Sequence, residues 1–267
     1  MPGFDNIKGS SPDQKDLVPP LMEADQVSKR YGEITALSET SFKIREGQIV
    51  GLVGSDGAGK TTLLRMAATM MPPTTGAIRI AELDVVREKA KVKGLIGYMP
   101  QRFGLYQDLT VAENLDFFMD VFGIWGDERK KRRERYLGFS NLLPYVDRKA
   151  GDLSGGMKQK LGLACVLVHH PRMLILDEPT NGVDPVSRKE FWDIIAEMKG
   201  EGMTILVSTA YLDEGEKCDR LILMHASHVL AEAPPSQLKK GFPDLEEAMV
   251  QRILAVDRSL SEKAVGV

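Results

Sequence analysis

The chain has few cysteines, no long apolar run and little net charge, and each shortage excludes a class of protein. Two cysteines in 267 residues allow neither a disulfide framework nor a cysteine-based metal cluster, and they suit a reducing compartment. No stretch approaches the roughly 18 consecutive apolar residues of a membrane-spanning helix. A net charge of −3 offers no overall basic surface for nucleic acid.

The N-terminal segment also lacks features that other classes of protein require. Residues 1–19 have no apolar core after the first Met, so they do not form a secretory signal. They are rich in Pro, Gly, Ser, Asp and Lys, and we expect a flexible tail. We therefore expect a cytoplasmic protein that reaches a membrane only through a partner.

Short apolar runs alternate with helical patterns along the rest of the chain, which predicts an α/β fold. The expected strands cover residues 21–31, 38–44, 48–53, 77–80, 95–99, 173–176, 204–207 and 221–230. Between about 101 and 171 the pattern is helical, which predicts a separate lobe inserted between strands. A helix over 187–199 joins two strands, and Leu245, Met249 and Ile253 share one face of a C-terminal helix.

The run Gly54-Ser55-Asp56-Gly57-Ala58-Gly59-Lys60-Thr61-Thr62 fits the phosphate-binding pattern G-x-x-x-x-G-K-[ST] at every fixed position. A buried strand precedes it and a helix follows, which is the context that the pattern requires. The glycines let backbone N–H groups approach phosphates, and the helix N-terminus adds positive charge. We expect Lys60 to reach the β- and γ-phosphates of a nucleotide and Thr61 to bind Mg²⁺.

Two adjacent acids, Asp177 and Glu178, close a hydrophobic strand. Successive strand residues point to opposite sides, so the two carboxylates can serve different tasks. Asp177 is expected to hold Mg²⁺ and Glu178 to polarise an attacking water. The alternative is a pair of strand-terminal acids that face solvent, and the phosphate loop makes that alternative weaker.

A second glycine motif lies at Ser154-Gly155-Gly156, just before a helical stretch. By itself the serine is a good helix N-cap. The other interpretation is a second phosphate cradle, made of backbone amides, a hydroxyl and a helix dipole.

With these three motifs in this order, the chain resembles the ATP-binding cassette (ABC) ATPases from about Leu21 to Leu230. The resemblance implies a P-loop NTPase with a RecA-like core, a mixed central sheet, an N-terminal antiparallel β-subdomain and an inserted α-helical lobe. It places the nucleotide-binding domain at 20–240, the lobe at about 101–171, and a C-terminal helix and tail at 241–267.

The resemblance also implies roles for further residues and a paired state. Tyr31 matches the aromatic residue that stacks on adenine, and Gln101 matches the glutamine that contacts Mg²⁺ and the attacking water. An ordinary strand-end tyrosine and a solvent-facing loop glutamine are the alternatives. Asn181-Gly182-Val183-Asp184 matches the loop at which two such domains touch, and Asp184 would be its fixed acid. In the family the Ser154-Gly155-Gly156 cradle of one domain caps the γ-phosphate held by Lys60 of the other.

The chain departs from the family pattern at Ala210, where the family has a histidine that contacts the γ-phosphate. Alanine has neither a donor nor a charge, so we expect normal ATP binding with slow hydrolysis. A naturally weakened site in an asymmetric pair is the favoured origin. An engineered change, or a site in which Glu178 alone suffices, stays open.

The resemblance therefore implies an ATP-hydrolysing subunit of an ABC transporter that powers a separate integral membrane subunit. Residues 98–101 and 208–214 look like those of exporters of drugs, antibiotics or polysaccharides. The partners would be a second ABC domain, identical or different, and the membrane subunit, without nucleic acid. The alternatives are a non-transport ABC protein of translation or DNA repair, and an ATP-gated binding module with little turnover.

Two features of the helical region carry weaker expectations. Phe117, Phe118, Phe122 and Trp125 are expected to form the core of the lobe, and the alternative is that one or two of them face a groove for a partner helix. The basic segment 128–135 is expected to be a solvated helix face with mixed charge pairs, in preference to a surface for lipid or nucleic acid.

Overall fold

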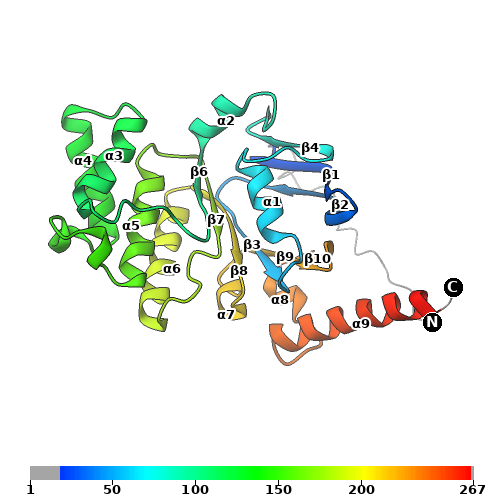
Figure 1. Ribbon diagram of the computed structural model, residues 1–267. Coiled ribbons are helices and arrows are strands. Elements are labelled where there is room, and N and C mark those ends of the chain that lie inside the picture. The colour runs from blue at the N-terminus through cyan, green and yellow to red at the C-terminus, as the bar shows by residue number, and fades with distance from the viewer. Residues whose placement is uncertain (1–18, 266–267) are drawn as a thin grey trace.

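The computed structural model describes residues 19–265, which form two β-sheets flanked by helices (Figure 1). The flexible tail expected over 1–19 lies outside the described residues, except for its last position. None of the helices in the described part is long and apolar enough to cross a bilayer.

The larger sheet has six strands in the order β10-β9-β3-β8-β7-β6. Its members are β3 (Ile49–Gly54), β6 (Ile96–Met99), β7 (Met173–Asp177), β8 (Thr204–Thr209), β9 (Arg220–His225) and β10 (His228–Ala233). All neighbours pair in parallel except β9 and β10, so the sheet is mixed, as expected.

The smaller sheet is antiparallel and is formed largely by the N-terminal strands. Its order is β2-β1-β4-β5, with β1 (Met22–Tyr31), β2 (Ile34–Ile44), β4 (Thr75–Ile80) and β5 (Leu83–Asp84). This sheet corresponds to the predicted antiparallel β-subdomain.

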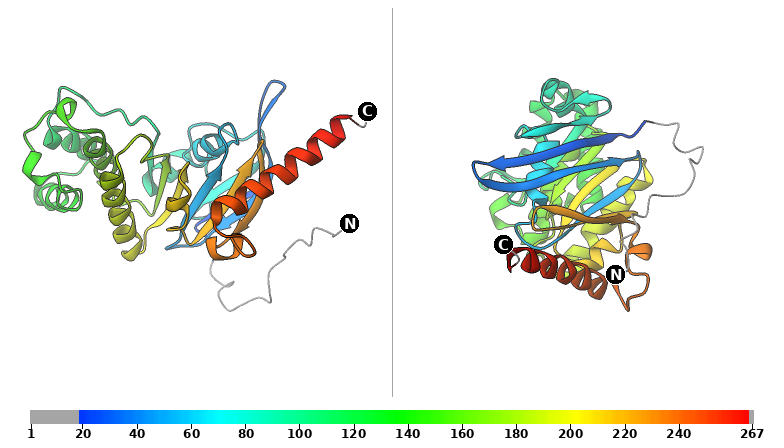
Figure 2. Two further views of the ribbon diagram at one scale, coloured as in Figure 1. Left: turned by 90° about the horizontal axis from the view of Figure 1, so that it is seen from below. Right: turned by 90° about the vertical axis from the view of Figure 1, so that its right-hand side faces the viewer.

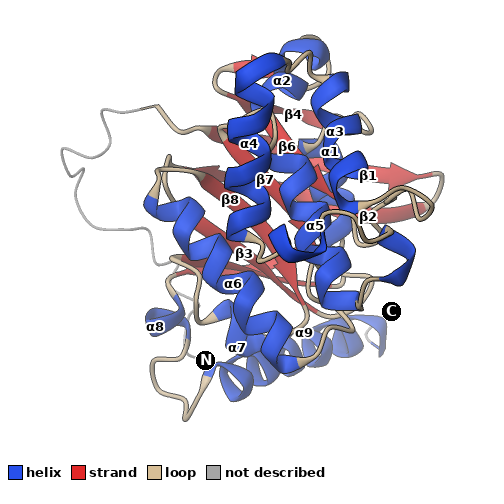
Figure 3. Ribbon diagram, turned by 90° about the vertical axis from the view of Figure 1, so that its left-hand side faces the viewer, coloured by secondary structure: helices blue, strands red, loops and turns tan. Residues whose placement is uncertain are grey.

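The helices fall into a group beside the smaller sheet, a group on the opposite side of the larger sheet, and a C-terminal helix that extends away from both (Figures 1 and 2). They are α1 (Lys60–Ala67), α2 (Lys89–Leu95), α3 (Val111–Val121), α4 (Gly126–Phe139), α5 (Gly155–Leu167), α6 (Pro185–Gly200), α7 (Leu212–Gly215), α8 (Pro235–Leu238) and α9 (Leu245–Val265). Short 3₁₀ turns cover Leu143–Tyr145 and Ala150–Asp152. Figure 3 shows α3 to α6 in front of the larger sheet.

Alternation of side chains along the parallel strands divides the core into two layers. Ile49 and Val53 of β3 pack in the layer that contains α5 and α6. Val50 and Leu52, the intervening residues, pack in the layer that contains α1 and the smaller sheet. Since both faces are covered, β3 carries an unbroken apolar run.

We expected the helical region to form a separate lobe, but it shares a buried core with the larger sheet. Leu115 of α3 and Leu137 of α4 belong to the same buried cluster as Leu174 and Leu176 of β7. The long helix α5 causes this continuity, because it is buried on nearly all sides and contacts both α3 and α6.

The predicted aromatic core of the lobe is wrong for three of its four members. Phe117, Phe122 and Trp125 are exposed, and only Phe118 packs against the core. The buried positions of α3 are Val111, Asn114, Leu115 and Met119, so Phe117 lies on its outer side, while Phe122 and Trp125 lie between α3 and α4.

The basic helix α4 forms the expected charge pairs. Arg129 and Arg133 bind Asp116 of α3, and Arg132 binds Glu128 one turn away. Arg135 binds Glu201 at the end of α6. The pairs attach this polar helix to its neighbours.

The strand predicted over 221–230 is in fact a hairpin. Ala226 and Ser227 have positive φ angles of 45° and 68°, and they join β9 to β10. Neither residue belongs to the usual turn formers Gly, Asn and Asp, so the turn carries little sequence signal.

A buried amide, Asn114, is expected to contribute strongly to the stability of the lobe. Its Nδ2 donates to the carbonyl oxygens of Tyr106, Leu109 and Thr110, and its Oδ1 accepts from the Tyr106 N–H. Asn114→Ala leaves these buried groups unpaired, so we expect a loss of about 2–4 kcal/mol in the free energy of unfolding. Urea denaturation measures it. A loss below about 0.5 kcal/mol would contradict this assignment.

Candidate nucleotide-binding site

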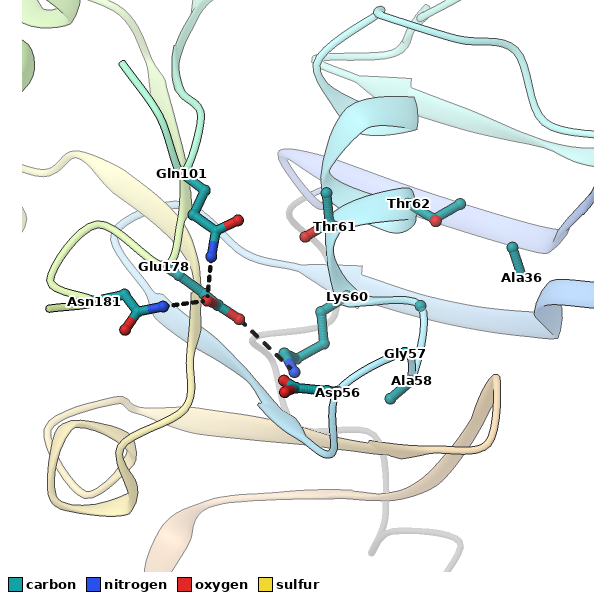
Figure 4. A pocket seen from close by; sticks show the side chains of 11 residues that line it. Ala36, Asp56, Gly57, Ala58, Lys60, Thr61, Thr62, Gln101, Glu178 and Asn181 are labelled. Carbon is teal, nitrogen blue, oxygen red and sulfur yellow. Dashed lines mark hydrogen bonds and ion pairs between the residues drawn. The ribbon is translucent and has the colours of Figure 1, made fainter.

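The carboxyl ends of the parallel strands meet at one edge of the larger sheet, where ligands bind in open α/β sheets. A cavity of about 390 Å³ opens there. It is lined by Ala36, Asp56, Gly57, Ala58, Gly59, Lys60, Thr61, Thr62, Gln101, Glu178 and Asn181 (Figure 4). The structure thus brings the predicted phosphate loop together with two predicted catalytic residues from distant parts of the chain.

The phosphate loop runs from the end of β3 to the start of α1 and needs its glycines. Gly54 and Gly59 have φ angles of 149° and 99°. A Cβ on Gly54 would lie 1.8 Å from the Met224 carbonyl oxygen, and one on Gly59 would lie 2.4 Å from that of Ala36. No other residue type fits these two positions, which explains this part of the motif in steric terms.

Lys60 is buried, and its ammonium group faces back across the loop. Nζ donates to the carbonyl oxygens of Gly54 at 2.8 Å and Ser55 at 3.0 Å, and it lies 4.0 Å from Glu178 Oε1. The loop therefore holds a desolvated positive charge at the cavity wall, with oxygen partners that phosphate oxygens can replace.

Asp177 is buried at the end of β7 and is held by two hydroxyl groups. Its Oδ1 accepts from Thr61 Oγ1 at 2.9 Å and from Ser208 Oγ at 2.9 Å. Asp177 pairs with Ser208 in the register of β7 and β8, so the sheet itself sets this contact. Carboxylate and hydroxyl oxygens side by side are a donor set that Mg²⁺ prefers.

Glu178 points to a different place from Asp177, as predicted, but the reason is different. Glu178 lies just beyond β7 and has a φ of 47°, so a left-handed backbone turn directs it, not strand alternation. Its N–H donates to Ser208 Oγ at 2.9 Å, which stabilises this uncommon conformation. Its Oε2 accepts from Gln101 Nε2 at 2.9 Å and Asn181 Nδ2 at 3.1 Å (Figure 4).

Three other predicted regions lie outside the cavity lining. Tyr31 is about half exposed at the end of β1, and its hydroxyl donates to the sulfur of Met71 at 3.0 Å. Ser154 accepts from the Met157 N–H as the N-cap of α5, and Gly155 beside it is exposed.

Asp184 is the N-cap of α6. Its carboxylate accepts from the N–H groups of Ser187 and Val186, and these hydrogen bonds, with one from the Ser187 side chain, lower the pKa of Asp184. In the single chain both Ser154 and Asp184 therefore start helices at the surface.

Ala210 follows the last residue of β8 and is exposed. Its neighbour Thr209 is buried, so the backbone at this position is fixed by the sheet. Among the described residues, no group of three His, Cys, Asp or Glu side chains is placed to hold a metal ion. A magnesium site would thus depend on hydroxyl, amide and phosphate oxygens as well as Asp177.

Several residues of the site escaped the sequence analysis. Ser208 binds both acids, but a lone serine carries no motif signal. Asn181 binds Glu178, a role that its place in the predicted pairing loop did not indicate. His225 at the end of β9 connects the phosphate loop to α9, because it hydrogen-bonds Ser55 Oγ at 2.8 Å and Asp257 at 2.9 Å. Pairing of β7 with β8 and of β3 with β9 places Ser208 beside Asp177 and His225 beside the phosphate loop, the latter across 170 residues.

A comparison with protein families gives the same assignment as the geometry. Residues 37–181, more than half of the chain, match the family model described as "ABC transporter". The chain belongs to this ABC transporter family. The match covers the phosphate loop, the helical lobe, the Ser154-Gly155-Gly156 motif and the acid pair Asp177 and Glu178.

Curated relatives in the ABC family include transporter ATP-binding proteins. The probable multidrug ABC transporter ATP-binding protein YbhF of Escherichia coli is 48% identical over 203 residues, which cover 76% of this chain. That alignment spans only 35% of YbhF, about a third of its length. The doxorubicin resistance ATP-binding protein DrrA of Mycobacterium tuberculosis is 38% identical over 231 residues, 85% of this chain and 70% of DrrA.

Solved ABC structures share the fold. A structure described as the ATP-binding subunit of an ABC transporter has a TM-score of 0.79 at 28% identity and covers 87% of this chain and 99% of its own. The cassette MJ0796, solved as a dimer with ADP and Pi, has a TM-score of 0.71 at 26% identity, with 80% of this chain and 98% of its own covered. These likenesses support the P-loop NTPase architecture with an inserted helical lobe.

Proposed function

We propose that this chain binds and hydrolyses ATP as the nucleotide-binding subunit of an ABC exporter. The observation that carries the proposal is the convergence of the phosphate loop, Gln101 and Glu178 on one cavity, with Asp177 bound to Thr61 at its base. The phosphate-binding residues are Gly54, Ser55, Asp56, Gly57, Ala58, Gly59, Lys60, Thr61 and Thr62. Tyr31, with its half-exposed ring, would stack on the adenine.

The oxygen groups at the base of the cavity fit Mg²⁺. Thr61 and Asp177 already lie within hydrogen-bonding distance of each other, and Gln101 offers an amide oxygen from the opposite wall. When bound, the ion neutralises charge that develops on the phosphates. The residues Thr61, Asp177 and Gln101 would hold it.

Glu178 is the residue proposed to polarise the attacking water. Its carboxylate accepts hydrogen bonds from Gln101 and Asn181 and lies 4.0 Å from Lys60. Bound nucleotide phosphates would attract the Lys60 ammonium group away from Glu178. Glu178 and Gln101 could then orient a water at the γ-phosphate. Gln101 follows β6 at the entry to the helical lobe, so it couples the site to that lobe.

The cradle Ser154-Gly155-Gly156 and the loop that ends at Asp184 are proposed to act on a second ABC domain. Ser154, Gly155 and Asp184 are exposed and lie outside the cavity of their own chain, whereas Gly156 is buried. The dimeric MJ0796 structure gives a precedent for a paired state. In such a pair, the exposed Ser154 and Gly155 of the cradle would cap ATP bound to the other domain.

A charge placed in the cradle is expected to prevent the pairing without unfolding the chain. A Cβ at Gly155 meets no atom within 4 Å, so Gly155→Glu fits the fold, but its carboxylate would repel the γ-phosphate. We expect ATP-dependent association to weaken at least about tenfold, since like charges at an interface cost several kcal/mol.

Analytical ultracentrifugation with Mg²⁺-ATP measures this association, in a Glu178→Gln background that prevents turnover. Gly94→Glu on α2 is the matched control, because that position is equally open and lies away from the cavity. Unchanged association of Gly155→Glu would exclude the cradle from the interface.

The transport role is inferred from the relatives. YbhF and DrrA are named as multidrug and drug-resistance ATP-binding proteins, and we infer export of a related kind of compound through a separate integral membrane subunit. The chain would then lie at the cytoplasmic face of the membrane. The nucleotide-binding domain is proposed to span 20–240, followed by the C-terminal helix and tail at 241–267.

The relatives do not favour a non-transport role. One observation supports the alternative of an ATP-gated module with little turnover. Ala210 lacks the hydrogen-bond donor that the family's histidine supplies at this position. Co-purification of the chain with a membrane subunit, followed by ATPase measurement, separates the two.

A further inference from the structure

A buried carboxylate close to the site has no role in the proposed chemistry. Glu214 lies in α7, directly after the loop that contains Ala210, and its exposed fraction is 0%. It accepts hydrogen bonds from Thr180 Oγ1 at 2.7 Å, Thr209 Oγ1 at 2.5 Å and Arg188 Nε at 3.1 Å. A buried charge is retained only with such partners, and this one binds three.

The three partners of Glu214 come from three segments around the cavity. Thr180 lies between Glu178 and Asn181 in the loop after β7. Thr209 ends β8, directly before Ala210. Arg188 lies in α6, four residues after Asp184, in the helix whose N-terminus borders the proposed pairing loop.

Arg188 strengthens the connection from the side of α6. Its guanidinium stacks on the Tyr211 ring, 3.8 Å from the ring centroid, and donates to both carboxylate oxygens of Asp213. Thr209 Oγ1 also accepts from the Tyr211 N–H at 3.0 Å. The segment 209–214 is therefore attached to α6 and to the loop after β7.

We propose that Glu214 is a positioning residue for ATP hydrolysis. It fixes the distance between the loop that carries Glu178 and the loop that carries Ala210, and it connects both to α6 and the pairing loop. A displacement of that pairing loop when a second domain binds would therefore reach Glu178. The inference depends on the proposed ATPase function, but concerns only how the hydrolytic geometry is held.

Glu214→Gln tests the proposal because it keeps the shape and removes the charge that holds Arg188. Glu214 itself does not line the cavity, so we expect the Kd for ATP to change less than twofold. The value of kcat should fall at least about tenfold, since misplaced catalytic groups lose rate steeply. Thermal unfolding of the same variant reports whether it is folded.

Glu190→Gln is the matched control. Glu190 lies two residues from Arg188 on α6 and binds Lys160 at 2.7 Å, so the same change removes an ion pair of the same helix without touching the loops. We expect its kcat and Kd to stay within twofold of those of the native chain.

Two further variants keep the test decisive if Glu214→Gln does not fold. Thr180→Val and Thr209→Val each remove one hydroxyl donor and keep the side-chain shape. If both threonines act through Glu214, we expect each single variant to lower kcat. The loss in the double variant, expressed as a free energy, should not exceed the sum of the two single losses. Unchanged kcat in folded variants would overturn the proposal, as would a loss of kcat matched by an equal loss of ATP affinity.

Slow native turnover does not block the experiment, because Ala210→His supplies a faster background. In the Ala210→His background, Glu214→Gln should remove most of the increase in kcat that histidine gives. If that increase is unaffected by Glu214→Gln, the positioning role is wrong but the proposed ATPase function still stands. Absence of ATP binding in the native chain would instead overturn the proposed function.

Discussion

Ala210→His is expected to raise the rate of ATP hydrolysis by about 10²-fold. A single preorganised donor at a developing charge contributes roughly 10²–10³ to a rate, and alanine supplies none. The position can accept a larger side chain, because Ala210 is exposed while the adjoining Thr209 is anchored to Glu214. The Kd for ATP should change little, since Lys60 and the loop amides hold most of the phosphate charge.

Steady-state ATPase assays of the purified chain, alone and with its partners, measure the effect. Ala210→Gln and Ala210→Leu are the controls: glutamine supplies a donor of different geometry, and leucine supplies only bulk. A native chain that already turns over rapidly, with no gain from histidine, would show that Glu178 suffices and that the departure from the family pattern is harmless. A gain restricted to histidine supports a naturally weakened site.

Lys60→Ala is expected to abolish ATP binding at micromolar concentrations, with a Kd at least about 10²-fold weaker. The Lys60 side chain is 5% exposed, and its ammonium group donates to carbonyl oxygens of the phosphate loop. Hydrogen bonds to charged groups contribute about 1.5–3 kcal/mol each, and Lys60 is placed to make them to two phosphates. Hydrolysis should be lost together with binding.

Equilibrium binding of labelled ATP tests this, with Lys60→Met to separate the charge from the packing of the side chain. Lys160→Met is the control, because Lys160 is equally buried but pairs with Glu190 outside the cavity. If Lys60→Ala retained ATP with native affinity, the phosphate-loop assignment and all roles that depend on it would be wrong.

The phosphate loop was predictable because its chemistry is local. Gly54, Gly59, Lys60 and Thr61 belong to one strand, one turn and one helix, and steric limits on the backbone leave little freedom in the residues used. The strands of the larger sheet were predictable for a related reason: both of its faces are covered, so each parallel strand is a short apolar run.

Other features could not be predicted, because their signal is weak or not local. Three of the four aromatic residues in α3 and the turn after it gave the wrong core, since composition does not say which side of a helix meets its neighbours. The turn at Ala226 and Ser227 uses left-handed backbone without Gly, Asn or Asp, the residues that favour this conformation. The direction of Glu178 depends on such a backbone turn, which its own sequence does not reveal.

By itself the sequence determined the α/β class, the phosphate loop, the acid pair and the family resemblance, because these depend on residue type and short spacing. Only the tertiary structure decided which side chains surround Glu178, how Ser208 joins the two acids, and that Glu214 connects three loops. The physical reason is that these contacts form across neighbouring strands and packed helices. Their geometry follows from strand register and burial. The types of two residues that lie 30 or more positions apart do not indicate that they are in contact.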